Sequence, residues 1–203
     1  MLHLQYSQFS NVSLPKETLS EERSRMLGLF KKKMAPDGPV DFTTEMQIEA
    51  SPLKVYSHLD WSSEDHTYRA LGEHVETIDS ARGFYRMHVA AMPGHQFDFA
   101  VTEAEPGKRY GYVSETRPII GRLVDMHSRY ELVALNDGTS CLVKSHGTAR
   151  FIDGLTQHQL DEEMSRMSLA CHNSLAKLKI HAEYGIEAVR NATMASVQRV
   201  RVE

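Results

Sequence analysis

Cysteine is scarce in this chain, and the spacing of the cysteines matches no metal-binding or redox motif. Only two occur among the 203 residues, Cys141 and Cys171, and neither has a second cysteine at CxxC spacing. Cysteines this sparse indicate reduced, buried thiols, which predicts a cytoplasmic protein. The N-terminus also lacks a basic segment followed by an apolar block, so no secretory signal is expected.

Three further absences limit the partners that the sequence predicts. No apolar run approaches the roughly 18 residues of a membrane-spanning helix, so no integral membrane segment is expected. The formal net charge is −4, and without a basic field we expect no nucleic-acid partner. The 11 histidines are scattered, with none at HxH or HxxxH spacing. We therefore predict no metal site and no cofactor, although a metal cluster assembled only in the folded chain remains an alternative.

The stretch from Leu155 to Gly185 carries the strongest structural signal. Residues 157–184 contain no glycine and no proline, and apolar or small residues recur every three or four positions, as on one face of a helix. This stripe comprises Leu160, Met164, Met167, Ala170 or Cys171, Ser174 or Leu175, Leu178 and Ala182. Charged residues are expected on the opposite face, namely Asp161, Glu162, Glu163, Arg166 and Lys177. We predict one long helix that ends at Gly185 and buries its stripe against a sheet.

The first forty residues form a predicted extension. Thr18 and Glu21 have the spacing of a capping box, and an amphipathic helix follows that ends near Lys31–Lys33. We expect this helix to pack on its own domain or on a sister subunit, with a membrane-surface helix as the alternative. The predicted division of the chain is an extension at 1–40, a main domain at 41–185 and a C-terminal tail at 186–203.

The main domain is predicted to be α+β. A strand at 40–50 leads through Ser51-Pro52 into a short helix, and a second short helix is expected at 64–71. Apolar and polar residues then alternate in segments expected to be strands, at 73–78, 83–92, 95–103, 109–116, 126–135 and 139–151. Short turns separate them, including an Asp-Gly hairpin turn at 136–138, so the strands form an antiparallel meander before the long helix.

Four phrases of the sequence resemble the START-like superfamily, also called SRPBCC, of polyketide cyclases, dehydratases and lipid-transport proteins. They are IEASPLKVY at 48–56, VTEAEPGKR at 101–109, YEL at 130–132 and DGT at 137–139. The long helix falls where this superfamily has its own, and the resemblance covers about residues 41–184. It implies a helix-grip fold, in which a curved antiparallel sheet wraps around the C-terminal helix over a deep apolar cavity. It implies no single chemistry, because no catalytic motif is shared across the superfamily.

Strand alternation assigns a set of tyrosine, serine and apolar residues to the concave face. The predicted ligand-binding residues are Tyr85, Met87, Phe97, Phe99, Tyr110, Tyr112, Ser114, Ser128, Tyr130 and Cys141 on the strands, and Met164, Met167, Ser168 and Cys171 on the helix. Each buried hydroxyl without a partner costs about 1–3 kcal/mol. A pocket that holds a partly polar ligand removes this cost. In the alternative, these hydroxyls bond one another across a filled core.

Three hypotheses about function follow. The favoured one is binding of an apolar, oxygenated small molecule, such as a lipid, a terpenoid or an aromatic, polyketide-like compound. The second is a metal-free cyclase or dehydratase, with Tyr112, Tyr130 and His95 as candidate acid–base residues. His88 and His146 fall on the outer face by alternation. The third is an interaction protein with a vestigial cavity that forms a homodimer through its terminal segments.

Overall fold

The computed structural model describes residues 32–200, with side chains described as far as residue 194. The elements are β1 (Val40–Ile48), α2 (Pro52–Leu59), α3 (Thr67–Leu71), β2 (His74–Asp79), β3 (Phe84–His88), β4 (Gln96–Glu105), β5 (Arg109–Arg117), β6 (Leu123–Leu135), β7 (Ser140–Phe151), α4 (Gln157–Tyr184) and α5 (Ile186–Val200). The helix expected in the N-terminal extension lies outside these residues. No helix within them is both long and apolar enough to cross a membrane.

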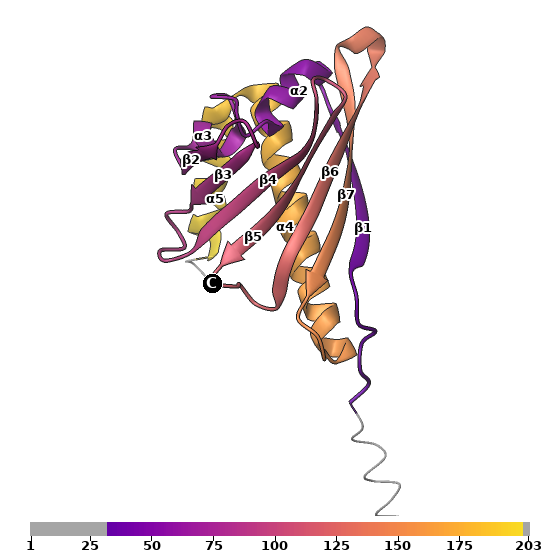
Figure 1. Cartoon of the computed structure of the whole chain (residues 1–203). Coiled ribbons are helices and arrows are strands. Elements are labelled where there is room, and N and C mark those ends of the chain that lie inside the picture. The colour runs from indigo at the N-terminus through magenta and orange to yellow at the C-terminus, as the bar shows by residue number, and fades with distance from the viewer. Residues whose placement is uncertain (1–31, 201–203) are drawn as a thin grey trace, which may run out of the picture.

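The strands form one antiparallel sheet of seven, in the order β1-β7-β6-β5-β4-β3-β2 (Figure 1). β2 to β7 follow one another as a meander, as predicted, whereas β1 pairs with the last strand, β7, from Val40 opposite Ala149 to Ile48 opposite Cys141. The two edge strands of the sheet are therefore β1 and β2. The α+β helix-grip architecture predicted from the sequence is confirmed.

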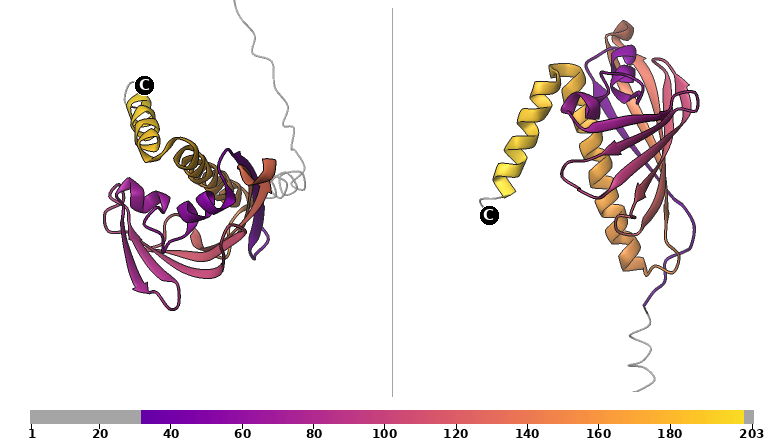
Figure 2. Two further views of the ribbon diagram at one scale, coloured as in Figure 1. Left: turned by 90° about the horizontal axis from the view of Figure 1, so that it is seen from above. Right: turned by 60° about the vertical axis from the view of Figure 1, so that its left-hand side comes forward.

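The long helix α4 has well-formed ends. The Thr156 side chain accepts a hydrogen bond from the backbone N–H of Gln159, whose own side chain accepts one from the backbone of Thr156, which makes a capping box. Gly185 ends the helix with a φ of 86°, a conformation that costs glycine little. Viewed from above, the sheet curves around α4 (Figure 2).

The predicted stripe of α4 is the face that packs inward. Met167, Leu175, Leu178 and Ala182 are buried. The prediction that Glu163 lies on the solvent face was wrong, because the residue is only 6% exposed. Arg122, from the loop before β6, and Arg166 both donate to its carboxylate, at 3.0 and 2.7 Å. Because Arg122 does not belong to α4, the periodicity of the helix alone could not predict this ion pair.

The two short helices cover one end of the sheet. The Ser51 side chain accepts from the backbone N–H of Lys54, and Pro52 begins α2 as the sequence predicts. The turn between α2 and α3 carries Trp61, which is 2% exposed. Its ring lies 4.0 Å from that of Phe99 on β4, and its backbone N–H donates to the Tyr110 hydroxyl at 3.0 Å. These contacts fix the α2–α3 segment to the sheet.

The last helix, α5, turns back after Gly185 and runs beside α4 before it diverges from the body (Figure 2). Val189 is buried. The Arg190 guanidinium donates to the carbonyl oxygen of Ala70 in α3, at 2.7 Å. The beginning of α5 therefore contacts α3 as well as α4.

A test of the packing between β1 and β7 is provided by Gly147. An added Cβ at this position would lie 2.6 Å from ring carbon Cε1 of Phe42 on β1. We expect Gly147→Ala to lower the free energy of unfolding by about 1–3 kcal/mol through overpacking. Gly111→Ala is the matched control, since its Cβ would meet the Thr102 hydroxyl oxygen at 3.1 Å. Urea unfolding of both variants measures the difference. Equal and small effects would show that the Phe42 ring does not cover Gly147.

Candidate functional site

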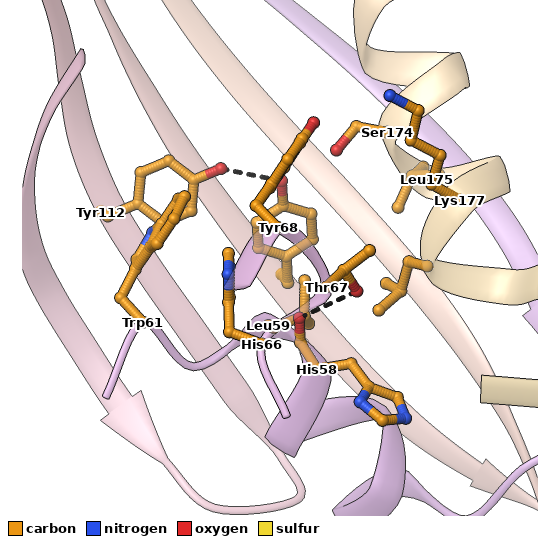
Figure 3. Close-up of a pocket in the computed structure, with 12 residues that line it drawn as sticks. His58, Leu59, Trp61, His66, Thr67, Tyr68, Tyr112, Ser174, Leu175 and Lys177 are labelled. Atoms are coloured by element: carbon orange, nitrogen blue, oxygen red, sulfur yellow. Dashed lines mark hydrogen bonds between the residues drawn. The ribbon is translucent and has the colours of Figure 1, made fainter. Parts of the chain in front are cut away.

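A small pocket lies where α2, α3 and the middle of α4 meet the concave face of the sheet (Figure 3). Its lining consists of His58, Leu59, Trp61, His66, Thr67, Tyr68, Tyr112, Tyr130, Ser174, Leu175, Lys177 and Leu178. The volume is about 30 Å³, which is room for about one water molecule. The pocket is therefore smaller than the resemblance implies, and a larger ligand requires a side chain to move.

Two tyrosine hydroxyls from neighbouring strands meet at the sheet side of the pocket. Tyr112 on β5 and Tyr130 on β6 lie with their hydroxyl oxygens 3.3 Å apart. Burial raises the pKa of Tyr112 to about 12 and also raises the pKa of Tyr130. Both side chains are therefore neutral at physiological pH. The bond between two hydroxyls uses only one of their two protons, so the pair keeps a donor for a further group.

Three buried nitrogen atoms of the pocket residues have no hydrogen-bond partner within the described part of the chain. They are His58 Nε2, Trp61 Nε1 and His66 Nδ1. The three residues are 6%, 2% and 4% exposed. A buried polar group without a partner costs about 1–3 kcal/mol, and such groups in native proteins usually mark a bound water or ligand. The pocket therefore has unmet hydrogen-bonding capacity from α2 and from the segment that connects it to α3.

The histidines beside the pocket are held in their neutral form. The rings of His58 on α2 and His181 on α4 stack at 3.9 Å, and the Thr67 hydroxyl lies 3.1 Å from His181 Nδ1. Burial lowers the pKa of His58, and it lowers that of His181 to about 4 and that of His66 to about 3. Charge on any of these rings would be poorly solvated. The three rings are therefore neutral at physiological pH.

The outer side of the pocket is formed by Tyr68, Ser174 and Lys177. Tyr68 comes from α3 and the other two from α4, and all three are partly exposed. The Lys177 ammonium lies over the Tyr68 ring, 5.6 Å from its centroid, within the range of a cation–π interaction. In Figure 3 the tips of these side chains lie on the same side of the pocket.

Several residues predicted to bind a ligand lie in a packed core beside the pocket. Tyr85, Met87, Phe99, Tyr110 and Cys141 are buried. Phe97 packs against the same cluster, and Ser128 is also buried. The Tyr110 hydroxyl accepts from the Trp61 backbone, so this residue has a structural partner. The Ser114 hydroxyl donates to the carbonyl of Met126, at 3.4 Å. The hydroxyls of Tyr110 and Ser114 therefore have partners within the protein.

The predicted residues of α4 lie away from the tyrosine pair. Met167 is buried in a second apolar cluster with Phe151 and Leu155. Met164, Ser168 and Cys171 line an open groove between α4 and β1. Ser168 is exposed there. Cys171 is partly buried, and burial raises its thiol pKa to about 11, so it is not a thiolate at neutral pH.

The third candidate acid–base residue, His95, is not brought to Tyr112 and Tyr130. It precedes β4, where Phe97 pairs with Thr116 near the far end of β5. Strands rise about 3.3 Å per residue, which separates His95 from Tyr112 by roughly 20 Å along the sheet. The structure therefore brings together two of the three candidates, and brings His66 to them in place of His95.

Sequence reasoning missed the pocket residues that come from the helices and from the segment between α2 and α3, namely His58, Trp61, His66, Tyr68, Ser174 and Lys177. Trp61 was the available signal, since it is the chain's one tryptophan and follows the first helix directly. Which residues face it depends on how the α2–α3 turn is placed over the sheet, and local periodicity does not specify that placement.

The buried histidines predict a loss of stability in acid. Their pKa values in the folded protein lie below the usual value of about 6.5, so below that pH the unfolded chain binds protons that the folded chain does not. The free energy of unfolding that these neutral histidines contribute is fully present above pH 6.5. It is lost as the pH falls toward their pKa values in the folded protein, which are about 4 for His181 and about 3 for His66. Urea unfolding at pH 7 and at pH 5 measures this fall.

A variant tests the part due to His66. His66→Phe keeps a ring against Trp61, whose centroid is 3.8 Å away, and removes one titrating group. We expect the loss of unfolding free energy between pH 7 and pH 5 to shrink by as much as about 2 kcal/mol. His172→Gln, at an exposed position on α4, should retain the wild-type pH dependence. An unchanged pH dependence in His66→Phe would contradict a neutral, buried His66.

Comparisons with known proteins identify the fold. No family model and no curated protein matches the chain. Solved structures that match include Ara h 8.0201, at 11% identity and a TM-score of 0.51, over 78% of this chain and 99% of that one. Protein CV1439 from Chromobacterium violaceum matches at 22% identity and a TM-score of 0.50, over 73% of this chain and 99% of its own.

A third match is DynU16, a protein in the dynemicin biosynthetic locus. It is 15% identical, with a TM-score of 0.51, over 74% of this chain and 49% of that chain. At these identities the likeness concerns the fold alone. The chain shares the helix-grip fold with these proteins.

Proposed function

We propose that this protein binds an apolar small molecule bearing an oxygen-containing group, in the pocket between the sheet and α4. The observation that carries the proposal is the presence of buried, unpartnered nitrogens at Trp61 and His66 beside the Tyr112–Tyr130 hydroxyl pair. Leu59, Leu175 and Leu178 supply apolar walls. A ligand with one hydrogen-bonding group on an apolar body matches this combination.

Binding of such a ligand requires the pocket to enlarge. Tyr68 is the side chain best placed to move, because it is partly exposed and belongs to the five-residue helix α3. Its ring covers the outer side of the pocket and is held by Lys177. An outward rotation of this ring would open the space beside Leu175 and the tyrosine pair, while the sheet stays in place.

Catalysis by the same pocket is the second candidate, and one observation favours it. Two neutral tyrosine hydroxyls that lie close together can polarise the carbonyl group of a substrate. A cyclase or dehydratase also needs a base whose pKa lies near the working pH. His66 lines the pocket, yet its pKa of about 3 makes it a weak base at neutral pH. Binding without chemistry is therefore the better-supported function.

The single tryptophan allows binding to be measured at the pocket itself. We expect geraniol, dodecanol or 3-phenylpropan-1-ol to change the fluorescence of Trp61 and to shift its indole N–H signal in ¹⁵N–¹H spectra. Tyr130→Phe removes one hydroxyl of the pair and should weaken binding by about three- to tenfold. Tyr184→Phe is the matched control, because Tyr184 is 73% exposed.

The opposite results would be equally clear. If none of the three alcohols perturbs Trp61, and native mass spectrometry of the purified protein detects no bound small molecule, the pocket is vestigial. The interaction-protein hypothesis would then be the stronger one, and the oligomeric state in solution would be the next measurement. If Tyr184→Phe weakens binding as much as Tyr130→Phe does, the hydroxyl pair does not contact the ligand.

A further inference from the structure

We propose that the ligand is an organic anion, an apolar monocarboxylate whose acid group binds at Lys177 on the outer side of the pocket. This inference rests on the proposed binding function and adds the charge and the orientation of the ligand. The observations that carry it are the charge balance of the pocket lining, the lack of a counter-ion at Lys177 and the distribution of apolar and polar groups.

The pocket lining is rich in donors and contains no acidic residue. Lys177 is its one lysine or arginine, and none of its residues is aspartate or glutamate. Trp61 Nε1 can only donate, and the hydroxyls of Tyr68 and Ser174 can donate as well. A lining with one cation, several donors and no carboxylate favours a negatively charged ligand over a cationic one.

Lys177 has no acidic partner among the described residues. Its ammonium group lies over the Tyr68 ring. By contrast, Lys108 pairs with Glu105 and Lys179 with Glu183, each at 2.8 Å or less. The sequence explains the difference. The residues three and four positions from Lys177 on α4 are asparagine, serine, isoleucine and histidine, so no helix neighbour can neutralise it. The ammonium group is therefore available to an anion.

The arrangement of groups gives the ligand a direction. Lys177 and Ser174 lie one helical turn apart on α4 at the outer side of the pocket, while Trp61 and Leu178 lie deeper and are 2% and 3% exposed. A carboxylate bound at Lys177 would have its apolar body directed toward Trp61. Any further oxygen on that body would reach the Tyr112–Tyr130 pair or the unpartnered nitrogen of Trp61.

The contact between Lys177 and Tyr68 couples anion binding to opening of the pocket. An exposed cation–π interaction contributes less than a charge-assisted hydrogen bond to a carboxylate. Lys177 would therefore leave the Tyr68 ring when an acid arrives, and the ring would then be free to rotate outward. A neutral ligand of the same shape cannot replace the Lys177–Tyr68 contact with a charge-assisted hydrogen bond.

The test compares an acid with an alcohol of the same skeleton. The probes are 3-phenylpropanoate and 3-phenylpropan-1-ol, titrated at pH 7 into the full chain and followed by calorimetry and by Trp61 fluorescence. We expect the acid to bind about tenfold more tightly than the alcohol, as one charge-assisted hydrogen bond would produce. Lys177→Met should remove this preference, so that the acid and the alcohol bind this variant with affinities within about twofold of each other.

Two variants serve as controls. Lys177→Arg keeps the positive charge and should retain the preference for the acid. Lys54→Met makes the same change in net charge at an exposed position on α2, outside the pocket lining, and should leave both affinities unchanged. Urea unfolding of each variant verifies that it is folded.

The possible outcomes separate this inference from the proposed function. If acid and alcohol bind equally well, or if Lys177→Met keeps the preference for the acid, the anion assignment is overturned while binding in the pocket stands. If neither probe nor the alcohols above perturb Trp61, both proposals fall.

Discussion

Burial of Trp61 between Phe99 and His66 is the interaction on which the rest of the site depends. The ring lies 4.0 Å from Phe99 and 3.8 Å from His66, and the backbone N–H of the same residue donates to Tyr110. These contacts hold the α2–α3 turn against the sheet. Because the turn is fixed, Thr67 reaches His181 on α4 and Tyr68 covers the pocket. A helix segment resting loosely on the sheet would assemble neither the histidine cluster nor the pocket.

The neutral histidines are the reason that the proposed function is binding and not acid–base chemistry. His58, His66 and His181 lie among aromatic and aliphatic side chains, where a protonated imidazole would lose its hydration without gaining a carboxylate partner. The rings therefore act as packing groups that can also hydrogen-bond. The charged group of the pocket is instead Lys177, which keeps contact with solvent at the outer side.

The sequence predicts those features of the structure that depend on residues close together in the chain. The bounds of α4 follow from an uninterrupted stripe and from Gly185, and strand alternation correctly turns Tyr112 and Tyr130 inward. Glu163 was placed on the wrong face because its partner Arg122 lies far away in the chain. The pocket residues of α2 and α3 were missed for a related reason. A short helix reveals its apolar face but not the surface that this face will meet.

The pairing of β1 with β7 has a consequence for how the chain acquires its fold. Every other neighbouring pair in the sheet is joined by a nearby turn, but β1 meets its partner only after all the intervening strands have been made. During synthesis the β1 segment therefore emerges before β7, the strand with which it pairs, has been made. Sequence-distant contacts of this kind slow folding. The exposed side chains that alternate along β1 include the polar residues Asp41, Thr43 and Glu45, a pattern that disfavours association of an unpaired strand with other chains.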